Sequence, residues 1–148
     1  MTQVYFGRSK FIPSALFKMM RQVGFAAVDM HFHTQYSMDA VSDIRSVLAQ
    51  CRKRGIGVAI TDHNEVAGAV KAWSMKKTEF IIAGMEASTQ EGAHALYYFH
   101  DIRDCKRFYF EVVKSLKKKN PFFLPIGIDK LMEKAKDYNA VIASAHPY

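Results

Sequence analysis

Short apolar runs alternate along the chain with longer segments in which apolar residues recur every three or four positions. Runs of this length are typical of buried strands, and the three-to-four spacing is typical of helices that bury one face. The pattern predicts strands at 28–33, 57–61, 80–84, 95–99 and 141–145. It predicts helices at 42–55, 66–77, 104–119 and 128–138.

This alternation of strands and helices predicts an α/β fold. Short links between the elements favour parallel strands joined by right-handed helical crossovers. Ser42 is a suitable first residue for one helix, and Gly55 is a natural stop for it. The carboxyl ends of parallel strands share one edge of a sheet, where ligands bind in folds of this class.

The chain divides into two predicted parts. Residues 27–148 carry the strands and helices. Residues 1–26 form an N-terminal extension, in which Pro13 and Ser14 are predicted to begin a short helix and Gly24 to end it. The apolar residues of this helix are expected to pack on the domain or on a partner (Leu16, Phe17, Met20 and Val23).

Composition narrows the class of protein. The 148 residues are 49% hydrophobic and 24% charged, which is ordinary for a globular protein. No apolar run reaches the roughly 18 residues that span a bilayer, and the N-terminus lacks the apolar core of a secretory signal. The expected location is the cytoplasm, with no membrane partner. Cys51 and Cys105 are therefore expected to be free thiols.

The net charge of +7 favours anionic partners, including phosphorylated metabolites and nucleic acid. Part of this charge has a simpler explanation, because cations stabilise the carboxyl ends of helices without any ligand. Residues 52–54 and 117–119 are basic runs of this kind. The sequence also lacks a basic stripe interleaved with aromatic residues, so nucleic-acid binding remains an alternative.

Metal-ligating side chains follow the predicted strands. His31 and His33 lie two residues apart in an extended segment, so their imidazoles face the same side. Asp39 follows six residues later, in a turn that could bring its carboxylate back. Other strands run into Asp62 and His63, into Glu86 and into His146. Imidazole and carboxylate groups gathered at one sheet edge predict the site of a metal-dependent hydrolase.

Four segments resemble the polymerase and histidinol phosphatase (PHP) family of metal-dependent phosphoesterases. Residues 31–34 (His-Phe-His-Thr), with Ser37 and Asp39, resemble its first motif. Residues 60–64 (Ile-Thr-Asp-His-Asn), followed by 66–68 (Val-Ala-Gly), resemble its second. Residues 84–86 (Gly-Met-Glu) resemble its third, and residues 144–147 (Ser-Ala-His-Pro) resemble its histidine-proline segment. The resemblance covers about residues 27–148.

The resemblance implies a distorted (β/α)7 TIM-like barrel with mainly parallel strands and up to three divalent metals. One metal would be held by His31, His33 and Glu86. Glu86 would bridge to a second metal, held also by His94 and His146. A third site would use Asp39 and His63. Glu86, Asp39 and Asp62 are the expected catalytic residues, with orientation of a ligand as the other role open to Asp62.

Family members use zinc, manganese, iron or magnesium, and this mixture of nitrogen and oxygen ligands does not distinguish among them. His100 and Asp101 are expected to be loop residues rather than ligands.

One feature departs from the family pattern. The family's last motif, an Asp-x-His that supplies two metal ligands, does not follow His146. The predicted domain is therefore an incomplete barrel that lacks its C-terminal part. A second copy of the chain or a missing C-terminal segment is the expected protein partner, and the chain alone is expected to have weak activity.

The leading functional hypothesis is metal-dependent hydrolysis of a phosphomonoester, a nucleotide or a nucleic-acid end. Within the enzymes, the alternative is exonuclease-like action on short oligonucleotides. Outside the enzymes, the alternatives are a metal-binding structural module with an incomplete site and a nucleic-acid-binding module.

Overall fold

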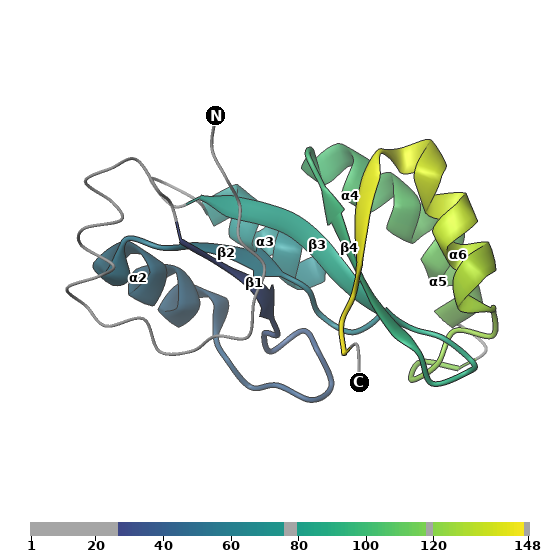
Figure 1. The fold of residues 1–148 in the computed structure, drawn as a ribbon. Helices are drawn as coiled ribbons and strands as arrows, with labels where there is room; N and C mark the ends of the chain where they lie inside the picture. Colours follow the sequence, from purple (N-terminus) through teal and green to yellow (C-terminus); the bar gives the residue numbers. More distant parts are fainter. Residues whose placement is uncertain (1–26, 76–79, 118–119, 147–148) are drawn as a thin grey trace.

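A single five-stranded sheet organises the chain (Figure 1). The structure is a computed structural model and describes residues 27–75, 80–117 and 120–146. The helix predicted within residues 1–26 and the basic residues Lys118 and Lys119 lie outside this part. The strands lie side by side in chain order: β1 (Val28–Phe32), β2 (Gly57–Ile60), β3 (Ile81–Ser88), β4 (His94–Phe99) and β5 (Ala140–Ser144). All five predicted strands are therefore present, with ends shifted by a few residues.

The helices also match the predicted segments. They are α2 (Ile44–Arg54), α3 (Ala67–Met75), α4 (Ile102–Phe108), α5 (Lys114–Lys117) and α6 (Ile128–Ala135). A π-helical turn, η1 (Tyr109–Val113), joins α4 to α5, and a 3-10 turn, η2 (Lys136–Tyr138), follows α6.

The start of α2 differs from the prediction. The capping residue is Asp43 rather than Ser42, because an Asp43 carboxylate oxygen accepts the Ser46 amide at 3.0 Å. The Ser42 carbonyl instead accepts the Gln35 amide. The predicted stop at Gly55 is confirmed: its φ is 65°, a left-handed conformation that glycine adopts without steric cost.

Strand direction is the main correction to the predicted fold. β1, β2 and β3 are parallel, but β4 is antiparallel to both β3 and β5. The link between β3 and β4 is a tight turn and not a helical crossover. In this turn the Thr89 amide donates to the Ala93 carbonyl, and Gly92 has a φ of 77°. Four of the five strands still run in one direction, so the sheet is mainly parallel.

This topology brings the carboxyl ends of β1, β2, β3 and β5 to one edge of the sheet, together with the amino end of β4. The chain between β4 and β5 descends through α4 and α5 and returns through α6 (Figure 1). These strand ends lie along the lower side of the sheet in Figure 1.

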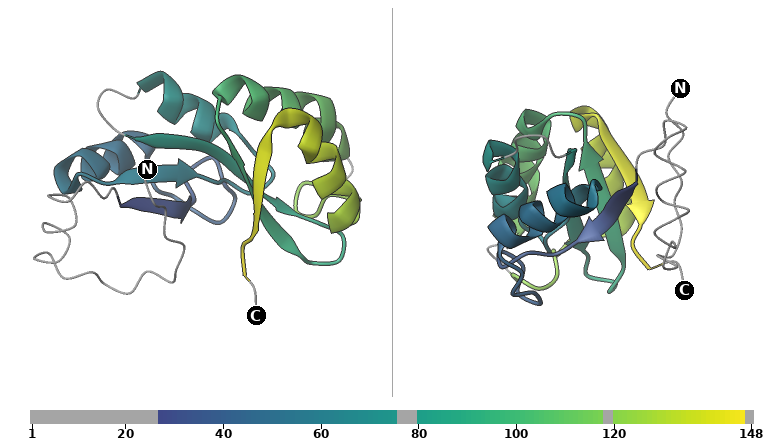
Figure 2. Two further views of the ribbon diagram at one scale, coloured as in Figure 1. Left: turned by 45° about the horizontal axis from the view of Figure 1, so that its top comes forward. Right: turned by 90° about the vertical axis from the view of Figure 1, so that its left-hand side faces the viewer.

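The helices cover one side of the sheet (Figure 2). Alternate strand residues point to this side and pack against helical side chains in two clusters. In the larger one the Phe108 ring stacks on the Tyr97 ring at 5.4 Å and meets the Tyr138 ring edge-on. The predicted burial of the apolar face of α2 is confirmed (Ile44, Val47, Leu48 and Cys51).

The other side of the sheet curls inward. The Tyr98 hydroxyl on β4 donates to the Met30 carbonyl on β1 at 2.8 Å, although β2 and β3 lie between these strands. In a flat sheet β1 and β4 would be about 14 Å apart, a span that one tyrosine side chain cannot bridge. Ala59 of β2 and Gly84 of β3 have little or no side chain, which leaves room for this contact. The sheet is therefore strongly curved.

Curvature of this kind occurs in barrels, but the sheet of the described residues is open, with β1 and β5 at its edges. Within these residues no helix has the length and apolar character that a membrane span requires. Both cysteines are free and buried, in α2 and α4, as predicted.

Two neighbouring tyrosines on β4 differ in whether the hydroxyl group has a hydrogen-bond partner. The Tyr97 hydroxyl is buried and has no hydrogen-bond partner among the described residues, whereas the Tyr98 hydroxyl has one. An unpaired buried hydroxyl costs about 1–3 kcal/mol, and a net hydrogen bond contributes about 1 kcal/mol. We expect Tyr97→Phe to raise the free energy of unfolding by about 1 kcal/mol and Tyr98→Phe to lower it by a similar amount. Urea denaturation of both variants measures this, and equal effects would contradict it.

Candidate metal centre

The shared strand edge gathers six ligand-type side chains. His31 lies in β1 and His33 just after it. Glu86 lies near the end of β3, and His94 begins β4. Two more histidines follow strands, His63 after β2 and His146 after β5. Because β4 runs against its neighbours, its first residue meets the carboxyl ends of the others.

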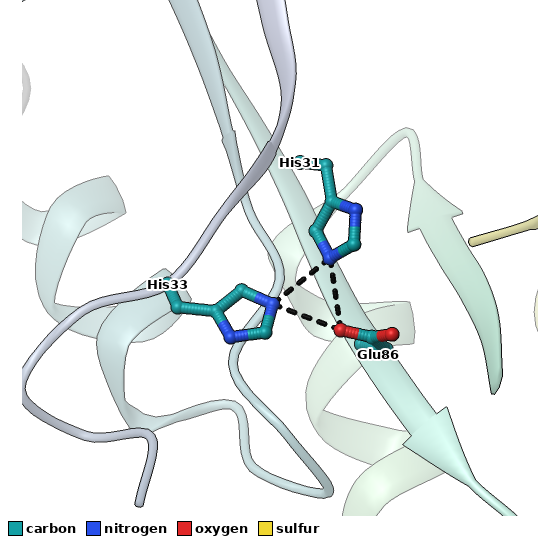
Figure 3. Close-up of side chains that lie close together, drawn as sticks. All are labelled: His31, His33 and Glu86. Atoms are coloured by element: carbon teal, nitrogen blue, oxygen red, sulfur yellow. Dashed lines mark hydrogen bonds and ion pairs between the residues drawn. The ribbon is translucent and has the colours of Figure 1, made fainter. Parts of the chain in front are cut away.

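The Glu86 carboxylate stands at the middle of this group. The side chain is fully buried, and its Oε2 lies 2.8 Å from Nε2 of His31 and 2.8 Å from Nε2 of His33 (Figure 3). These two imidazole nitrogens are 2.9 Å apart. His63 Nε2 approaches the same oxygen at 3.6 Å.

The second oxygen of Glu86 faces different histidines. Oε1 lies 2.9 Å from Nδ1 of His94 and 3.6 Å from Nε2 of His146. Among the described residues, every ion pair of Glu86 is with an imidazole. The two oxygens of one carboxylate thus divide five histidines into two sets.

The charges of Glu86 and His33 depend on each other. Burial favours the neutral acid, but hydrogen bonds with His31 and His33 and the charges of nearby imidazoles hold the pKa of Glu86 well below its usual value. Burial also opposes protonation of His33. Hydrogen bonds with Glu86 and Asp39 outweigh this and raise the pKa of His33 to about 9.

Asp39 reaches back from its loop as predicted. Its Oδ2 lies 3.0 Å from Nδ1 of His33 and 3.4 Å from Nε2 of His63. The Ser37 hydroxyl also donates to Asp39 and accepts the His63 amide at 3.1 Å. Burial of Asp39 acts against ionisation, but the bonds from Ser37 and His33 lower its pKa. Asp39 therefore links two imidazoles from different strands.

Asp62 lies apart from this group. Its side chain is fully buried, and its two oxygens accept the Thr34 amide at 2.6 Å and the Thr34 hydroxyl at 2.9 Å. A Cβ on Gly68 would lie 2.0 Å from Asp62 Oδ2, so only glycine leaves room for this contact. Asp62 therefore joins the loop after β1 to the end of β2. This placement fits the orienting role and not contact with a substrate.

The two residues that were predicted not to be ligands, His100 and Asp101, lie away from the metal centre. His100 is exposed and follows β4 at the opposite edge of the sheet. Asp101 caps α4, where its carboxylate accepts the Arg103 amide at 2.7 Å.

Four short polar side chains at the site had no predicted role. Thr34 and Ser37 hold Asp62 and Asp39, as described above. The Ser88 hydroxyl lies 3.1 Å from Nδ1 of His63. Asn64 is fully buried with a φ of 49°, and its Oδ1 accepts the Ser88 amide at 3.1 Å. These four residues lie close in sequence to the predicted ligands. A polar residue within a buried motif needs a hydrogen-bond partner, so this position could have indicated a supporting role.

The donor set fits divalent metal ions. Three groups each place their ligand atoms within 4.8 Å of one another: His31, His33 and Glu86; His33, Asp39 and His63; His63, Glu86 and His94. Imidazole nitrogen and carboxylate oxygen are the ligands of zinc, manganese and iron. When the imidazoles are deprotonated, the buried Glu86 carboxylate has no positive partner among them, and a bound cation would then supply one. His146 lies outside these three groups, although it approaches Glu86, and its side chain is 66% exposed.

The sequence of this chain matches a family model. The PHP domain model covers residues 29–147 and includes all the side chains described above. The chain belongs to the PHP domain family. The predicted resemblance is therefore confirmed, whereas the metal-binding role of each residue remains a prediction.

Individual relatives extend the comparison. The uncharacterized protein MJ1587 of Methanocaldococcus jannaschii is 28% identical in an alignment 134 residues long, which covers 81% of this PHP chain and 67% of that protein. A provisionally assigned metal-dependent phosphoesterase from Bifidobacterium adolescentis is 25% identical, with a TM-score of 0.47 over 76% of this chain and 44% of its own.

A third relative is an amidohydrolase from Chromobacterium violaceum whose structure contains sulfate and no metal. It is 23% identical, with a TM-score of 0.52 over 63% of this chain and 34% of its own, which is a likeness of fold alone. The chain thus spans less than half of each of these two solved proteins.

The raised pKa of His33 predicts how metal binding depends on pH. Below about pH 9 a metal must displace the His33 proton, so affinity should rise with pH and binding should release a proton. An ordinary histidine, with a pKa of about 6.5, would be deprotonated well before that point. We therefore expect zinc affinity still to increase between about pH 7 and pH 9. Competition with a chromophoric chelator measures it, and a constant affinity across this range would contradict the prediction.

Proposed function

We propose that this PHP chain is a metal-dependent hydrolase that acts on phosphoesters. The observation that carries the proposal is the fully buried Glu86 carboxylate at the meeting point of five imidazoles. A fold gains little from placing so many ionisable groups around one acid, whereas metal-dependent catalysis requires such a set. Family membership supports the same conclusion.

Glu86 is suited to bridge two metal ions, because its oxygens face different histidines. His31 and His33 would hold one ion on the Oε2 side. His94, with His146, would hold a second ion on the Oε1 side. His63, together with Asp39, would complete a third position. Zinc, manganese, iron and magnesium are all candidates for these positions.

The chain's own residues hold these ligands in place. Asp39 contacts Nδ1 of His33, which directs Nε2 of the same ring toward Glu86. Ser88 contacts Nδ1 of His63 in the same way. Hydrogen bonds to the far nitrogen of an imidazole fix its tautomer and ring orientation. Asp62 supports the site one step further away by fixing the loop that begins at Thr34.

Divalent ions in this set would polarise a phosphoryl oxygen and generate hydroxide from water near neutral pH. Glu86 and Asp39 would hold the metal ions at the site through their negative charge. The net charge of +7 would attract an anionic substrate. A phosphomonoester, a nucleotide or a nucleic-acid end fits this chemistry, and so does a short oligonucleotide. We also propose that further protein, from a second copy or from a C-terminal segment, completes the barrel and the site.

The first experiment addresses metal binding. His31→Ala combined with His33→Ala removes the two imidazoles nearest to Glu86 Oε2 and leaves Glu86 with three of its five histidine partners. We expect the wild-type chain to carry two or more equivalents of transition metal, and the double variant to lose at least one of them and all phosphoester turnover. Elemental analysis and a phosphatase assay measure the two effects, and circular dichroism checks the fold. Normal turnover in the double variant would exclude the proposed mechanism.

The second experiment compares two residues at opposite edges of the sheet. Glu86→Gln keeps the size of the side chain but removes the charge that would bridge two ions, so we expect a loss of kcat of about 100-fold or more. His100→Ala removes an exposed histidine outside the group and should leave kcat within about twofold. Steady-state kinetics with one phosphomonoester provides both values. Equal losses would show that Glu86 has no special role.

The same assays distinguish the alternative functions. A structural metal-binding module would bind metal at one position at most and hydrolyse no phosphoester. A nucleic-acid-binding module would retain its affinity after metal removal, and that affinity would fall steeply with salt.

A further inference from the structure

Two loops that adjoin residues of the metal centre carry exposed apolar side chains. Of the nine large hydrophobic side chains that are exposed in the described residues, five lie on the two loops 33–43 and 120–127. Both loops lie along the lower side of the sheet in Figure 1, the same side as the strand ends that the histidines adjoin. Single exposed apolar residues are normal on a protein surface, but a group at a functional edge is typical of a ligand-binding surface. The five residues are Tyr36, Met38, Val41, Phe122 and Phe123.

The second of these loops is joined to the metal centre by hydrogen bonds. Asn64, the residue after His63, donates from Nδ2 to the Phe122 carbonyl at 3.0 Å and to the Pro121 carbonyl at 3.4 Å. The Leu124 amide donates to the carbonyl of Ser88 at 2.8 Å. Asn64 also accepts the Ser88 amide, so one buried side chain connects the loop to both β2 and β3.

The loop is also fixed from within. The Asn120 side chain accepts the amides of Phe122 and Phe123, at 2.8 Å and 3.1 Å. The next residue, Leu124, is fully buried and anchors the loop in the core. Phe122 and Phe123 are nevertheless 59% and 43% exposed. The backbone is thus held firmly while two phenyl rings face solvent, which gains the fold nothing by burial.

The loop that carries Asp39 repeats this arrangement. Tyr36 and Met38 are 40% and 52% exposed and lie shortly before Asp39 in the chain. The Tyr36 amide donates to the Thr34 hydroxyl, which in turn donates to Asp62. In both loops, exposed apolar side chains therefore stand on backbone that is hydrogen-bonded to a residue adjacent to a histidine of the metal centre, Thr34 after His33 and Asn64 after His63.

We propose that Phe122 and Phe123 form a subsite for the planar ring of a phosphoester substrate, a nucleobase, while its phosphate lies at the metal centre. This inference rests on the proposed function and narrows its substrate class. An aromatic side chain binds a base by stacking, which strengthens binding by about 5-fold to 150-fold per base and depends little on base identity. The subsite therefore selects nucleotides over phosphates of sugars and simple alcohols, and it does not select one base.

The kinetic test uses the full chain loaded with manganese and two probes, adenosine 5′-monophosphate and glycerol 3-phosphate. Phe122→Ala and Phe123→Ala should each lower the ratio of kcat/KM for the nucleotide to that for glycerol 3-phosphate by at least about fivefold, mainly through KM. Phe122→Trp keeps an aromatic ring and should retain the wild-type ratio. The matched control is Phe80→Ala, because Phe80 is 60% exposed and precedes β3 at the end opposite Glu86.

A binding test does not depend on turnover. Adenosine, which carries no phosphate, is titrated into the metal-free chain and followed by equilibrium dialysis. We expect measurable binding that both phenylalanine variants weaken at least fivefold and that Phe80→Ala leaves unchanged.

The outcomes distinguish failure of the aromatic subsite from failure of the phosphoesterase proposal. Adenosine binding that depends on both phenylalanines, without hydrolysis of any phosphoester, would support the subsite and overturn the phosphoesterase proposal. Hydrolysis of both probes with a ratio unaffected by the phenylalanine variants would overturn only the subsite. A wild-type chain that sediments as a dimer and a Phe122→Ala variant that sediments as a monomer would also overturn it, because a second copy would then cover these rings.

Discussion

The burial of the Glu86 carboxylate is the constraint around which the rest of the chain is arranged. A fully buried ionised acid is costly unless every side of it is paired. Its partners come from β1, from the segment that follows β2, from the start of β4 and from the segment that follows β5. The order of the strands, the tight turn after β3 and the return of the chain through three helical segments all serve to bring these imidazoles to one carboxylate.

Local sequence carries much of this information. The spacing of His31 and His33 places two imidazoles on one side of an extended segment, and the contacts of both with Glu86 show why that spacing is informative. Asp39 could be predicted because a short loop leaves few places for its carboxylate. The core faces of α2 and α3 follow from apolar periodicity alone.

Other features depend on distant contacts and could not be predicted in this way. Gly92 marks a turn in the sequence, but the choice between a hairpin and a crossover depends on how β4 pairs with both neighbours. Asp62 and His63 are adjacent, and the sequence left two roles open for Asp62, catalysis or orientation of a ligand. Consecutive residues point in opposite directions, so His63 meets the other histidines while Asp62 meets Thr34. The π-helical turn after α4 has no clear signal in the chain.

The alternation of side chains along β3 limits how this strand can change in evolution. Glu86 and Ser88 point to the metal centre, whereas Met85 and Ala87 point to the helical core. Insertion or deletion of one residue before Glu86 would exchange these two sets, placing a carboxylate in the core and a methionine among the histidines. We therefore expect substitutions to be tolerated one position at a time in β3, and changes in length to be tolerated only in the loops.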